Sequence, residues 1–349
     1  MGIIGNRTLP KHILVVRLSA MGDVAMLPHA IRALKGAYPD VKVTVATRPL
    51  FRPFFEGLDV DFMPIEVKTD YNSFGKLMTL AREMRDLGID AFADTHRVWR
   101  SLVIRNVMWL HGMRTAKISK GHIEKWFRVG YSNSSAVPLK HTVVRYCDVF
   151  RDLGFVFDNP TPVVKSPRPN PLGEKHGTWV GFAPFSAHRG KTYPEDMSRE
   201  AVKLLSEKYD RVFIHSGGGA EAEFAREMER TYANVTALNG ILKDLGSEMD
   251  LISNLDCVVS MDSLVMHLAS LVATPVVSVW GATHPELGFL GYGCDPEGVL
   301  QVEMRCRPCS TYGNTKCKFG DYRCIRAVTP QMIADRVALM IAKNARVQA

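Results

Sequence analysis

Two periods alternate along the hydrophobic and polar positions of this 349-residue chain. Short runs rich in β-branched residues predict strands, whereas longer stretches with apolar residues at helical spacing, such as Leu27, Ile31 and Leu34, predict helices. Strands that alternate with helices in this way predict a parallel sheet covered by helices on both faces. In the first half the expected strands span residues 12–18, 41–47 and 90–96, and the expected helices span 26–39, 73–88, 101–112 and 142–154.

The alternation restarts after a proline-rich segment at residues 159–173, whose composition favours extended backbone over a packed core. A chain of this length exceeds one ordinary compact domain. We therefore expect an α/β protein with two doubly wound domains, at residues 1–165 and 166–328, followed by a C-terminal helix within 329–349. In the second half the expected strand regions span 178–184, 211–219, 234–238, 255–262 and 274–281.

The net charge of +8 is carried by the first half of the chain. Residues 1–165 contain 24 Lys and Arg against 15 Asp and Glu, and residues 166–349 contain 20 against 21. A basic first domain favours an anionic partner, which could be a phosphorylated sugar, an acidic lipid headgroup or a nucleic acid.

The sequence also narrows the class of protein. The first twelve residues lack the apolar run of a secretory signal, and no run approaches the roughly 20 apolar residues that cross a bilayer, so we expect a soluble, cytoplasmic protein. Residues 96–130 are basic and contain several aromatic residues, which is compatible with nucleic-acid binding. Their apolar periodicity and the lack of a compact binding motif favour packed α/β elements instead. No nucleic acid is therefore expected as a partner.

The loops that follow the strands are the places to look for chemistry, because ligands of open parallel sheets bind at the carboxyl ends of the strands. The first such loop, RLSAMGDV, places Gly22 and Asp23 at the start of a helix. Asp23 has two interpretations. It caps the helix, which is the commonest role of Asp at such a position, or it is a general base that accepts a proton from a sugar hydroxyl. One carboxylate could serve both roles.

Two loops of the second half carry charged residues after a buried strand. In APFSAHRGKTYP, Lys191 is either a solvated surface lysine or a point charge for a phosphate, with Ser186 as a further donor. In HSGGGAEAEF the three glycines do not match the G-x-G-x-x-G fingerprint, which argues against a dehydrogenase. Glu221 or Glu223 could bond to ribose hydroxyls, or could simply favour the start of a helix.

The loop VVSMDSLVMHLASL places Asp262 between a buried strand and a helix. The backbone N–H groups of Ser263, Leu264 and Val265 would then point out of the helix start and form a seat for a phosphate. The alternative is that Asp262 only caps the helix and that His267 is a hydrogen-bonded buried histidine.

Four of the seven cysteines lie close together in the sequence, at Cys306, Cys309, Cys317 and Cys324. A C-x-x-C pair followed by two more cysteines is compatible with a structural zinc site, although the spacing does not match a standard knuckle. Disulfides and free thiols are the alternatives, and a reducing cytoplasm disfavours the disulfides. No catalytic metal ion is expected.

The loops occur in an order that resembles a known family. RLSAMGDV near the start, GKTYP and GGGAEAE after the first two strands of the second domain, and MDSLVMHLASLVATPVVSVWGATHP together resemble the family 9 glycosyltransferases, the ADP-heptose:lipopolysaccharide heptosyltransferases. The likeness extends over most of the chain. It implies a GT-B fold, in which two Rossmann-like domains face a central cleft. It further implies that the first domain binds the acceptor, the second binds the donor nucleotide sugar, and the terminal helix packs back on the first domain.

Residue by residue, the resemblance implies that Asp23 is the catalytic base. It implies that Lys191 contacts the donor phosphates and that Glu221 lies near the position of a glutamate that contacts the ribose. Asp262 and the amides after it would hold the donor sugar and phosphate, with His267 behind them.

Three positions depart from the usual pattern of the family. Leu264 stands where a glycine is common, which leaves the amides available but limits how closely a phosphate approaches. His284 stands where an aspartate is often seen, and Tyr193 where a tryptophan is common. These departures bear on the identity of the donor more than on the fold.

The expected function is metal-independent transfer of a heptose or related sugar from an ADP-sugar to the lipopolysaccharide inner core, with inversion at the anomeric carbon. The helix start and Lys191 would stabilise the departing diphosphate, and Asp23 would deprotonate the acceptor hydroxyl. The ADP-sugar is a substrate, and no cofactor is required. The basic first domain favours an acidic acceptor at the cytoplasmic face of the inner membrane, with His96, Arg97 and Arg100 as candidate contacts.

Two alternatives stay open: a GT-B transferase with another nucleotide-sugar donor, and a non-catalytic protein that binds a sugar nucleotide. The nucleotide that stabilises the protein tests the first, and turnover of an ADP-sugar tests the second.

Overall fold

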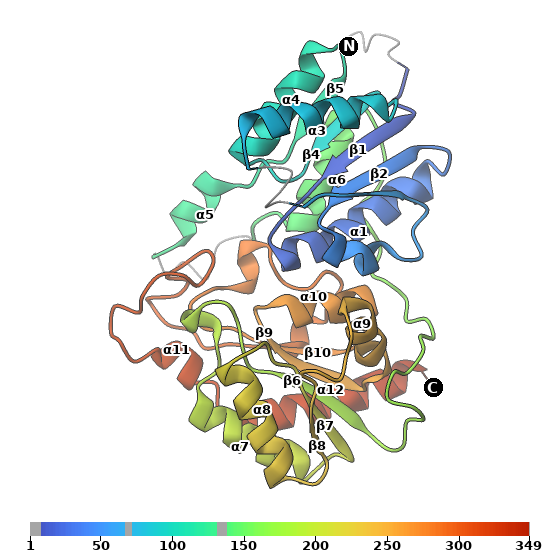
Figure 1. Cartoon of the computed structure of the whole chain (residues 1–349). Helices are drawn as coiled ribbons and strands as arrows, with labels where there is room; N and C mark the ends of the chain where they lie inside the picture. The colour runs from blue at the N-terminus through green and yellow to red at the C-terminus, as the bar shows by residue number, and fades with distance from the viewer. Residues whose placement is uncertain (1–7, 67–71, 131–137, 349) are drawn as a thin grey trace. The chain divides into compact units, whose positions relative to one another are not determined.

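The computed structural model describes residues 8–66, 72–130 and 138–348, and its contacts divide the chain into two compact units (Figure 1). The first unit contains Met1–Lys120 and Thr142–Thr161. The second contains Gly121–His141 and Pro162–Ala349. The chain thus leaves the first unit for the last time within the proline-rich segment found in the sequence.

The first unit is built on a parallel five-stranded sheet in the order β3-β2-β1-β4-β5. The central strand β1 pairs with β2 on one side and with β4 on the other, and all five of its residues are buried. Its apolar run is continuous because both faces of the sheet are covered. The elements are β1 (His12–Val16), α1 (Met21–Ala37), β2 (Lys42–Thr47), η1 (Pro49–Phe55), β3 (Asp61–Pro64), α3 (Phe74–Asp86), β4 (Ala91–Asp94), α4 (Trp99–Leu110), β5 (Arg114–Lys117) and α6 (Thr142–Asp152).

The second unit is built on a parallel six-stranded sheet in the order β11-β10-β9-β6-β7-β8. Its central strands β6 and β9 are buried along their whole length. The strands are β6 (Trp179–Ala183), β7 (Arg211–Ile214), β8 (Val235–Ala237), β9 (Cys257–Met261), β10 (Val276–Val279) and β11 (Val299–Leu300). The helices are α5 (His122–Arg128), η2 (Arg189–Lys191), α7 (Glu195–Ser206), α8 (Ala220–Thr231), α9 (Leu245–Asn254), α10 (Leu264–Leu271), η3 (Pro285–Leu287), η4 (Pro296–Gly298), α11 (Arg323–Arg326) and α12 (Pro330–Gln348).

Both sheets reverse their strand order at one place, which confirms the predicted α/β class with two doubly wound parallel sheets. The reversal lies between β1 and β4 in the first unit and between β6 and β9 in the second. Ligands of such sheets bind outside the carboxyl ends of the strands at this switch point. The loops after β1, β4, β6 and β9 are therefore the best positions for functional side chains.

Residues 121–141 differ from the domain limits expected from the sequence, because they group with the second unit rather than with the rest of residues 1–165. Backbone hydrogen bonds explain the difference: Gly130 N–H donates to the Pro308 carbonyl at 2.8 Å, and Leu139 N–H donates to the Glu286 carbonyl at 2.9 Å. Periodicity predicts the type of an element but not the partner on which it packs.

The C-terminal helix α12 packs on α7, β9 and β10 of its own unit. Its residues Ile333, Val337 and Met340 are buried in the core of that unit. This packing accounts for the apolar spacing from which the helix was expected. That the helix also packs back on the first domain stays a prediction.

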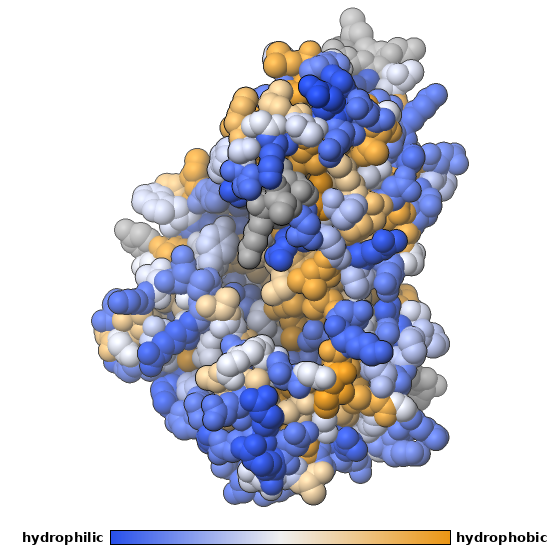
Figure 2. Space-filling view, in the orientation of Figure 1, coloured by the Kyte–Doolittle hydropathy of each residue, from blue (hydrophilic) through white to orange (hydrophobic). Residues whose placement is uncertain are grey.

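The surface visible in Figure 2 is mostly hydrophilic, with hydrophobic residues in separate patches. Within the described ranges, no helix is long and apolar enough to cross a membrane. Two short helices nevertheless expose several large apolar side chains. On α4 these are Trp99, Leu102, Trp109 and Leu110, and on α5 they are Ile123, Trp126 and Phe127.

Candidate active site

The loop after β1 holds an ion pair between Arg17 and Asp23. The Asp23 carboxylate lies 2.5 Å from Arg17 Nη2 and accepts a hydrogen bond from Ala20 N–H at 3.3 Å. Ala20 is the N-cap of α1, and Asp23 is the third helical residue. The capping interpretation required Asp23 to be the N-cap itself, which it is not. A negative charge in the first turn still favours the helix. The Asp23 side chain is 26% exposed, which leaves it accessible to a substrate.

Arg17 was not among the expected functional residues, although it begins the motif RLSAMGDV. Its side chain is 6% exposed, and Nη1 donates to the Thr95 carbonyl at 2.5 Å. The guanidinium lies 5.7 Å from the centre of the Tyr146 ring, and the Tyr146 hydroxyl donates to the Asp23 carbonyl at 3.0 Å. These contacts fix the position of both members of the ion pair.

His96 lies beside this pair, in the loop after β4. Its Nε2 atom is 3.1 Å from the Ser19 hydroxyl. Burial lowers the pKa of His96 to about 3, and the positive charges of Arg17 and Lys120 act in the same direction. The imidazole is therefore neutral at physiological pH and is a weak proton acceptor. This makes His96 a weaker candidate for a general base than the expected residue Asp23.

Three further basic residues follow the strands of the first unit. Lys120 comes after β5, and burial together with the charge of Arg17 lowers its pKa. Arg97 is exposed, and its guanidinium donates to the Ile118 carbonyl at 3.2 Å. The Arg100 guanidinium lies 5.1 Å from the centre of the Trp99 ring. Lys120 was missed because β5 has a weak strand pattern, so the loop after it was not recognised.

The second unit joins Lys191 to Asp262 across its switch point. Lys191 comes from η2 after β6, and Asp262 directly follows β9. Lys191 Nζ lies 3.3 Å from Asp262 Oδ2, and the same oxygen accepts a hydrogen bond from the Thr283 hydroxyl at 2.8 Å. The side chains of Lys191 and Asp262 are 15% and 8% exposed. Lys191 is therefore not the solvated surface lysine of the alternative interpretation.

Helix α10 begins beside this pair. Its N-cap is Ser263, so Asp262 does not cap the helix. The first N–H groups of an α-helix have no acceptor within the helix, and the amides of Ser263, Leu264 and Val265 belong to this set. They can bind an anion next to the Lys191 ammonium group. His267 is buried one turn further along, as the resemblance implied.

The other residues expected to bind the donor nucleotide sugar make hydrogen bonds within their own loops. The Glu221 carboxylate accepts the N–H of Gly217 at 2.9 Å and thereby closes the glycine-rich loop before α8. Ser186 N–H donates to the Thr192 hydroxyl oxygen at 3.2 Å, and that hydroxyl donates to the Ser186 carbonyl at 3.0 Å. Glu221 and Ser186 each follow a strand of the second unit, so they lie at the carboxyl ends of the strands, as Lys191 does.

Two of the departures from the family pattern have structural roles. The Tyr193 side chain is buried in the core, and its hydroxyl donates to the Val328 carbonyl at 2.6 Å. His284 Nδ1 accepts the Glu286 N–H at 3.2 Å, and burial lowers the pKa of His284 to about 4. Both side chains therefore serve packing and loop geometry.

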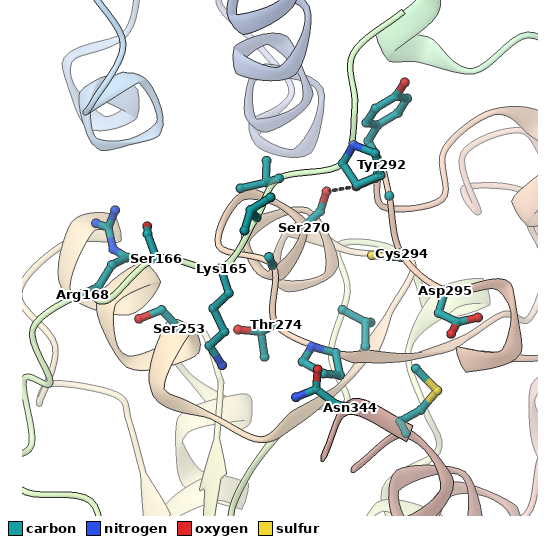
Figure 3. A pocket seen from close by; sticks show the side chains of 18 of the residues that line it. Lys165, Ser166, Arg168, Ser253, Ser270, Thr274, Tyr292, Cys294, Asp295 and Asn344 are labelled. Carbon is teal, nitrogen blue, oxygen red and sulfur yellow. Dashed lines mark hydrogen bonds between the residues drawn. The ribbon is translucent and has the colours of Figure 1, made fainter. Parts of the chain in front are cut away.

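A cavity of about 810 Å³ lies in the second unit, on the side of the sheet opposite the carboxyl ends of its strands (Figure 3). It is lined by residues 162–168, by the segments that lead into β9 and β10, by residues 292–295 and by α12. Within it, the Ser270 hydroxyl donates to the Tyr292 carbonyl at 2.6 Å. Because the lining precedes these strands, the cavity lies at their amino ends. Lys191 and Asp262 are not part of its lining, and we do not assign it to the donor.

The four cysteines of the C-terminal loop line one small cavity of about 220 Å³ and are free thiols. Over the described ranges, no three His, Cys, Asp or Glu side chains form a group that could hold a metal ion as they stand. The residues that share this cavity are Cys306, Cys309, Cys317 and Cys324.

Comparison with known proteins identifies the family of the chain and confirms its fold. The model of glycosyltransferase family 9 (heptosyltransferase) matches residues 80–319. No curated protein sequence matches the chain.

Solved structures show the same fold. The ADP-heptose lps heptosyltransferase II of E. coli is 18% identical, with a TM-score of 0.69 over 96% of this chain and 99% of that one. A family 9 glycosyl transferase of Veillonella parvula DSM 2008 is 15% identical, with a TM-score of 0.73 over 95% and 98%. The E. coli heptosyltransferase WaaC with ADP-2-deoxy-2-fluoro heptose is 19% identical, with a TM-score of 0.64 over 95% and 99%. The predicted GT-B fold is confirmed.

Proposed function

The chain belongs to glycosyltransferase family 9, the heptosyltransferases, and from this premise we propose that it transfers a heptose or related sugar from an ADP-sugar to the lipopolysaccharide inner core. The observation that carries the proposal is the pairing of Lys191 with Asp262 beside the start of α10. The donor class is supported by WaaC, whose structure contains an ADP-heptose analogue.

Departure of the diphosphate places negative charge on the oxygen that leaves the sugar. The Lys191 ammonium and the first amides of α10 provide positive charge and donors at one place, without a metal ion. Before the donor binds, Asp262 holds Lys191 at this place. When the diphosphate binds, Lys191 exchanges the carboxylate for phosphate oxygens, and Asp262 keeps the Thr283 hydroxyl.

Asp23 accepts the proton of the attacking hydroxyl. The new bond forms between the acceptor oxygen and the anomeric carbon while the bond to the diphosphate breaks on the opposite face, so the configuration inverts. An aspartate carboxylate is ionised at neutral pH and can take this proton. The neutral, buried imidazole of His96 is less suited to the role.

The acceptor is an acidic, lipid-linked oligosaccharide. The basic surplus of the first 165 residues favours an anionic substrate, and Arg97 and Arg100 are the proposed contacts with its acidic groups. An acceptor without phosphate should then have a higher KM, and added salt should weaken binding of the phosphorylated form. Activity that responds to neither change would remove the acidic acceptor from the proposal.

We also propose that the enzyme works at the cytoplasmic face of the inner membrane. Ile123, Trp126 and Phe127 lie at helical spacing on α5 and are 74%, 71% and 63% exposed. Aromatic side chains of this kind enter the headgroup region of a bilayer, and nearby Lys and Arg residues are attracted to anionic lipids.

The central experiment measures ADP release from ADP-heptose with a purified inner-core acceptor. A thermal-shift series with ADP, UDP and GDP accompanies it. We expect stabilisation by ADP alone and ADP release that depends on the acceptor. Preferential stabilisation by UDP or GDP would favour another nucleotide-sugar donor. Stabilisation by ADP without turnover on any core acceptor would favour a non-catalytic sugar-nucleotide binder.

A further inference from the structure

A cavity of about 810 Å³ in the second unit takes no part in the proposed transfer reaction (Figure 3). Its volume lies within the range of pockets that bind small organic molecules. The segments that precede β9 and β10 line it, so it lies at the amino ends of these strands. Lys191 and Asp262 follow β6 and β9 and lie at the carboxyl ends. A ligand in this cavity would therefore be distinct from the donor nucleotide sugar.

The walls of the cavity are mostly aliphatic. The aliphatic side chains include those of Val163, Val164, Pro167, Pro275, Val276 and Met340. Of the described residues in the lining, only Tyr292 is aromatic, and its ring packs against His141 with the ring centres 5.1 Å apart. Planar rings such as nucleobases bind to proteins largely by stacking on aromatic side chains. The walls therefore suit a flexible hydrocarbon chain better than a planar ring.

The proline-rich segment forms a fixed wall of this cavity. The Asn254 side chain, at the end of α9, donates to the carbonyls of Arg168 at 3.4 Å and Pro169 at 3.2 Å. Proline residues in the segment also restrict its backbone. A wall that is already ordered loses little conformational freedom when a ligand binds.

Positive charge predominates among the charged side chains of the cavity. Lys165, Arg168 and Lys343 are cationic, and Asp295 is the only acid among the described residues of the lining. Arg168 Nε lies 2.6 Å from Asp250 Oδ1. Lys343 Nζ lies 2.5 Å from Asp295 Oδ2. These pairs neutralise two of the cations, and the remaining charge of Lys165 favours an acidic ligand.

Lys165 is the cation of the cavity that lacks a carboxylate partner. Its ammonium group donates to the Leu255 carbonyl at 3.4 Å, and none of the described carboxylates lies within salt-bridge distance of it. Asp256 acts on Lys165 electrostatically, but its carboxylate is paired with Lys175 at 2.7 Å. The ammonium group is therefore available to a carboxylate from a ligand.

The Asn344 side chain provides a second donor. It comes from α12, and its amide has no hydrogen-bond partner among the residues that the structure describes. Figure 3 shows Lys165 pointing between Ser253 and Thr274, with the Asn344 amide on the same side of the pocket as the ammonium group. An ammonium group and an amide NH₂ together can donate to the oxygens of one carboxylate.

We propose that this cavity binds a single acyl chain that ends in a carboxylate, such as a free fatty acid. The chain lies along the aliphatic walls, and the carboxylate contacts Lys165 and Asn344. Burial of the chain provides most of the affinity, and the ammonium group selects an acid over a neutral lipid.

The first experiment measures binding to the full chain by isothermal titration calorimetry, after removal of bound lipid and without detergent. Hexanoate, octanoate and decanoate are the probes, and octanol and acetate are the controls. We expect the dissociation constant to fall by up to about fourfold with each added CH₂. Octanol should bind about tenfold more weakly than octanoate, and acetate should not bind. Equal binding of octanol and octanoate, or affinities that do not change with chain length, would overturn the proposal.

The second experiment compares Lys165→Glu with the control Lys203→Glu, which changes an exposed lysine of α7 outside the cavity. Lys165 is also at an exposed position, so its replacement should not unfold the protein. Lys165→Glu should weaken octanoate binding about tenfold or more, and the control should leave it unchanged. Asn344→Leu should weaken binding of octanoate but not of octanol. Unchanged octanoate affinity in Lys165→Glu would contradict the assigned contact with the acid.

The same titrations are repeated with excess ADP. Octanoate binding should not change, because the cavity is separate from the residues proposed to bind the donor. Competition by ADP would place the acid at the nucleotide site and overturn the proposal. The binding of fatty acids does not depend on turnover, so its result stands whether or not the proposed function is correct.

Discussion

The Arg17 guanidinium and the Ala20 N–H both contact the same carboxylate oxygen of Asp23, Oδ2, at 2.5 and 3.3 Å. The other oxygen, Oδ1, takes part in neither contact. One oxygen thus orients the side chain, and the second would be available to the proposed substrate hydroxyl. This division would let Asp23 stabilise the helix start and also act as the proposed base.

Asp23→Asn should separate the two roles. The amide can still accept the Ala20 N–H but cannot take a proton, so turnover should fall by roughly 10² or more with little change in the KM of the ADP-sugar. Arg17 loses a charged partner but keeps the Thr95 carbonyl, so we expect a loss of about 1–2 kcal/mol in the free energy of unfolding. Steady-state kinetics and urea denaturation measure these effects.

The control is Asp59→Asn, since Asp59 is 89% exposed in its pair with Lys35. It should leave turnover and stability nearly unchanged. An Asp23→Asn protein that melts early but turns over at a near-normal rate would give Asp23 a structural role only.

Lys191→Ala should lower kcat/KM for the ADP-sugar at least tenfold, or about 1.4 kcal/mol, because the departing diphosphate loses its cation. Lys203→Ala, at an exposed position of α7, is the matched control and should behave as wild type. Initial rates across a range of donor concentrations provide the measurement. Unchanged kinetics for Lys191→Ala would remove this lysine from the site.

His96 should make the protein less stable in mild acid. Its pKa is lowered to about 3 in the folded protein from an ordinary value of 6.5, so the unfolded chain binds a proton first as the pH falls. The contribution of neutral His96 to the free energy of unfolding is fully present above about pH 6.5. It declines as the pH falls from there towards 3. His284, with its pKa lowered to about 4, acts in the same direction.

Urea denaturation at pH 7.5, 6.5 and 5.5 tests the contribution of His96. The wild-type protein should lose stability over this range, and His96→Gln should lose less. His176→Gln changes an exposed histidine and should follow the wild type. Equal slopes for His96→Gln and wild type would contradict the burial of a neutral imidazole at this position.

Membrane association should depend on the exposed face of α5. Replacing Trp126 and Phe127 together by Ala should reduce binding to anionic lipid vesicles at least tenfold, because two large apolar groups are lost. Vesicle flotation gives the bound fraction, and activity on a soluble acceptor fragment shows that the active site is intact. Undiminished flotation of the double variant would exclude this face of α5 as the contact.

Much of the fold could be predicted because buried parallel strands have apolar runs that are easy to recognise. Strands β1, β2, β4 and β6 to β10 all lie within expected regions. The edge strand β3 (Asp61–Pro64) and the edge strand β5 (Arg114–Lys117) were missed, since edge positions are partly exposed and their sequences, DFMP and RTAK, lack the pattern. The loops of the switch points followed from the strands that precede them.

The site could be predicted only as far as the loops that carry it. Periodicity placed Asp23, Lys191 and Asp262 after strands, which the structure bears out. No local pattern in the sequence predicts that Arg17 pairs with Asp23 or that Lys120 lies near this pair. Both features depend on how the side chains of separate loops come together. Gly313 packs against the Lys191 side chain, and a steric contact of this kind leaves no signal in the composition of the sequence.

The chain passes from one unit to the other at residues 120–121, 141–142 and 161–162. A chimaera of two related transferases that is joined only in the proline-rich segment would therefore take residues 121–141 from one parent and their packing partners from the other. The backbone hydrogen bonds of Gly130 and Leu139 would then meet foreign loops. Exchange of donor specificity between relatives therefore requires three junctions. Residues 121–141 and the second unit, on which they pack, then come from the same parent.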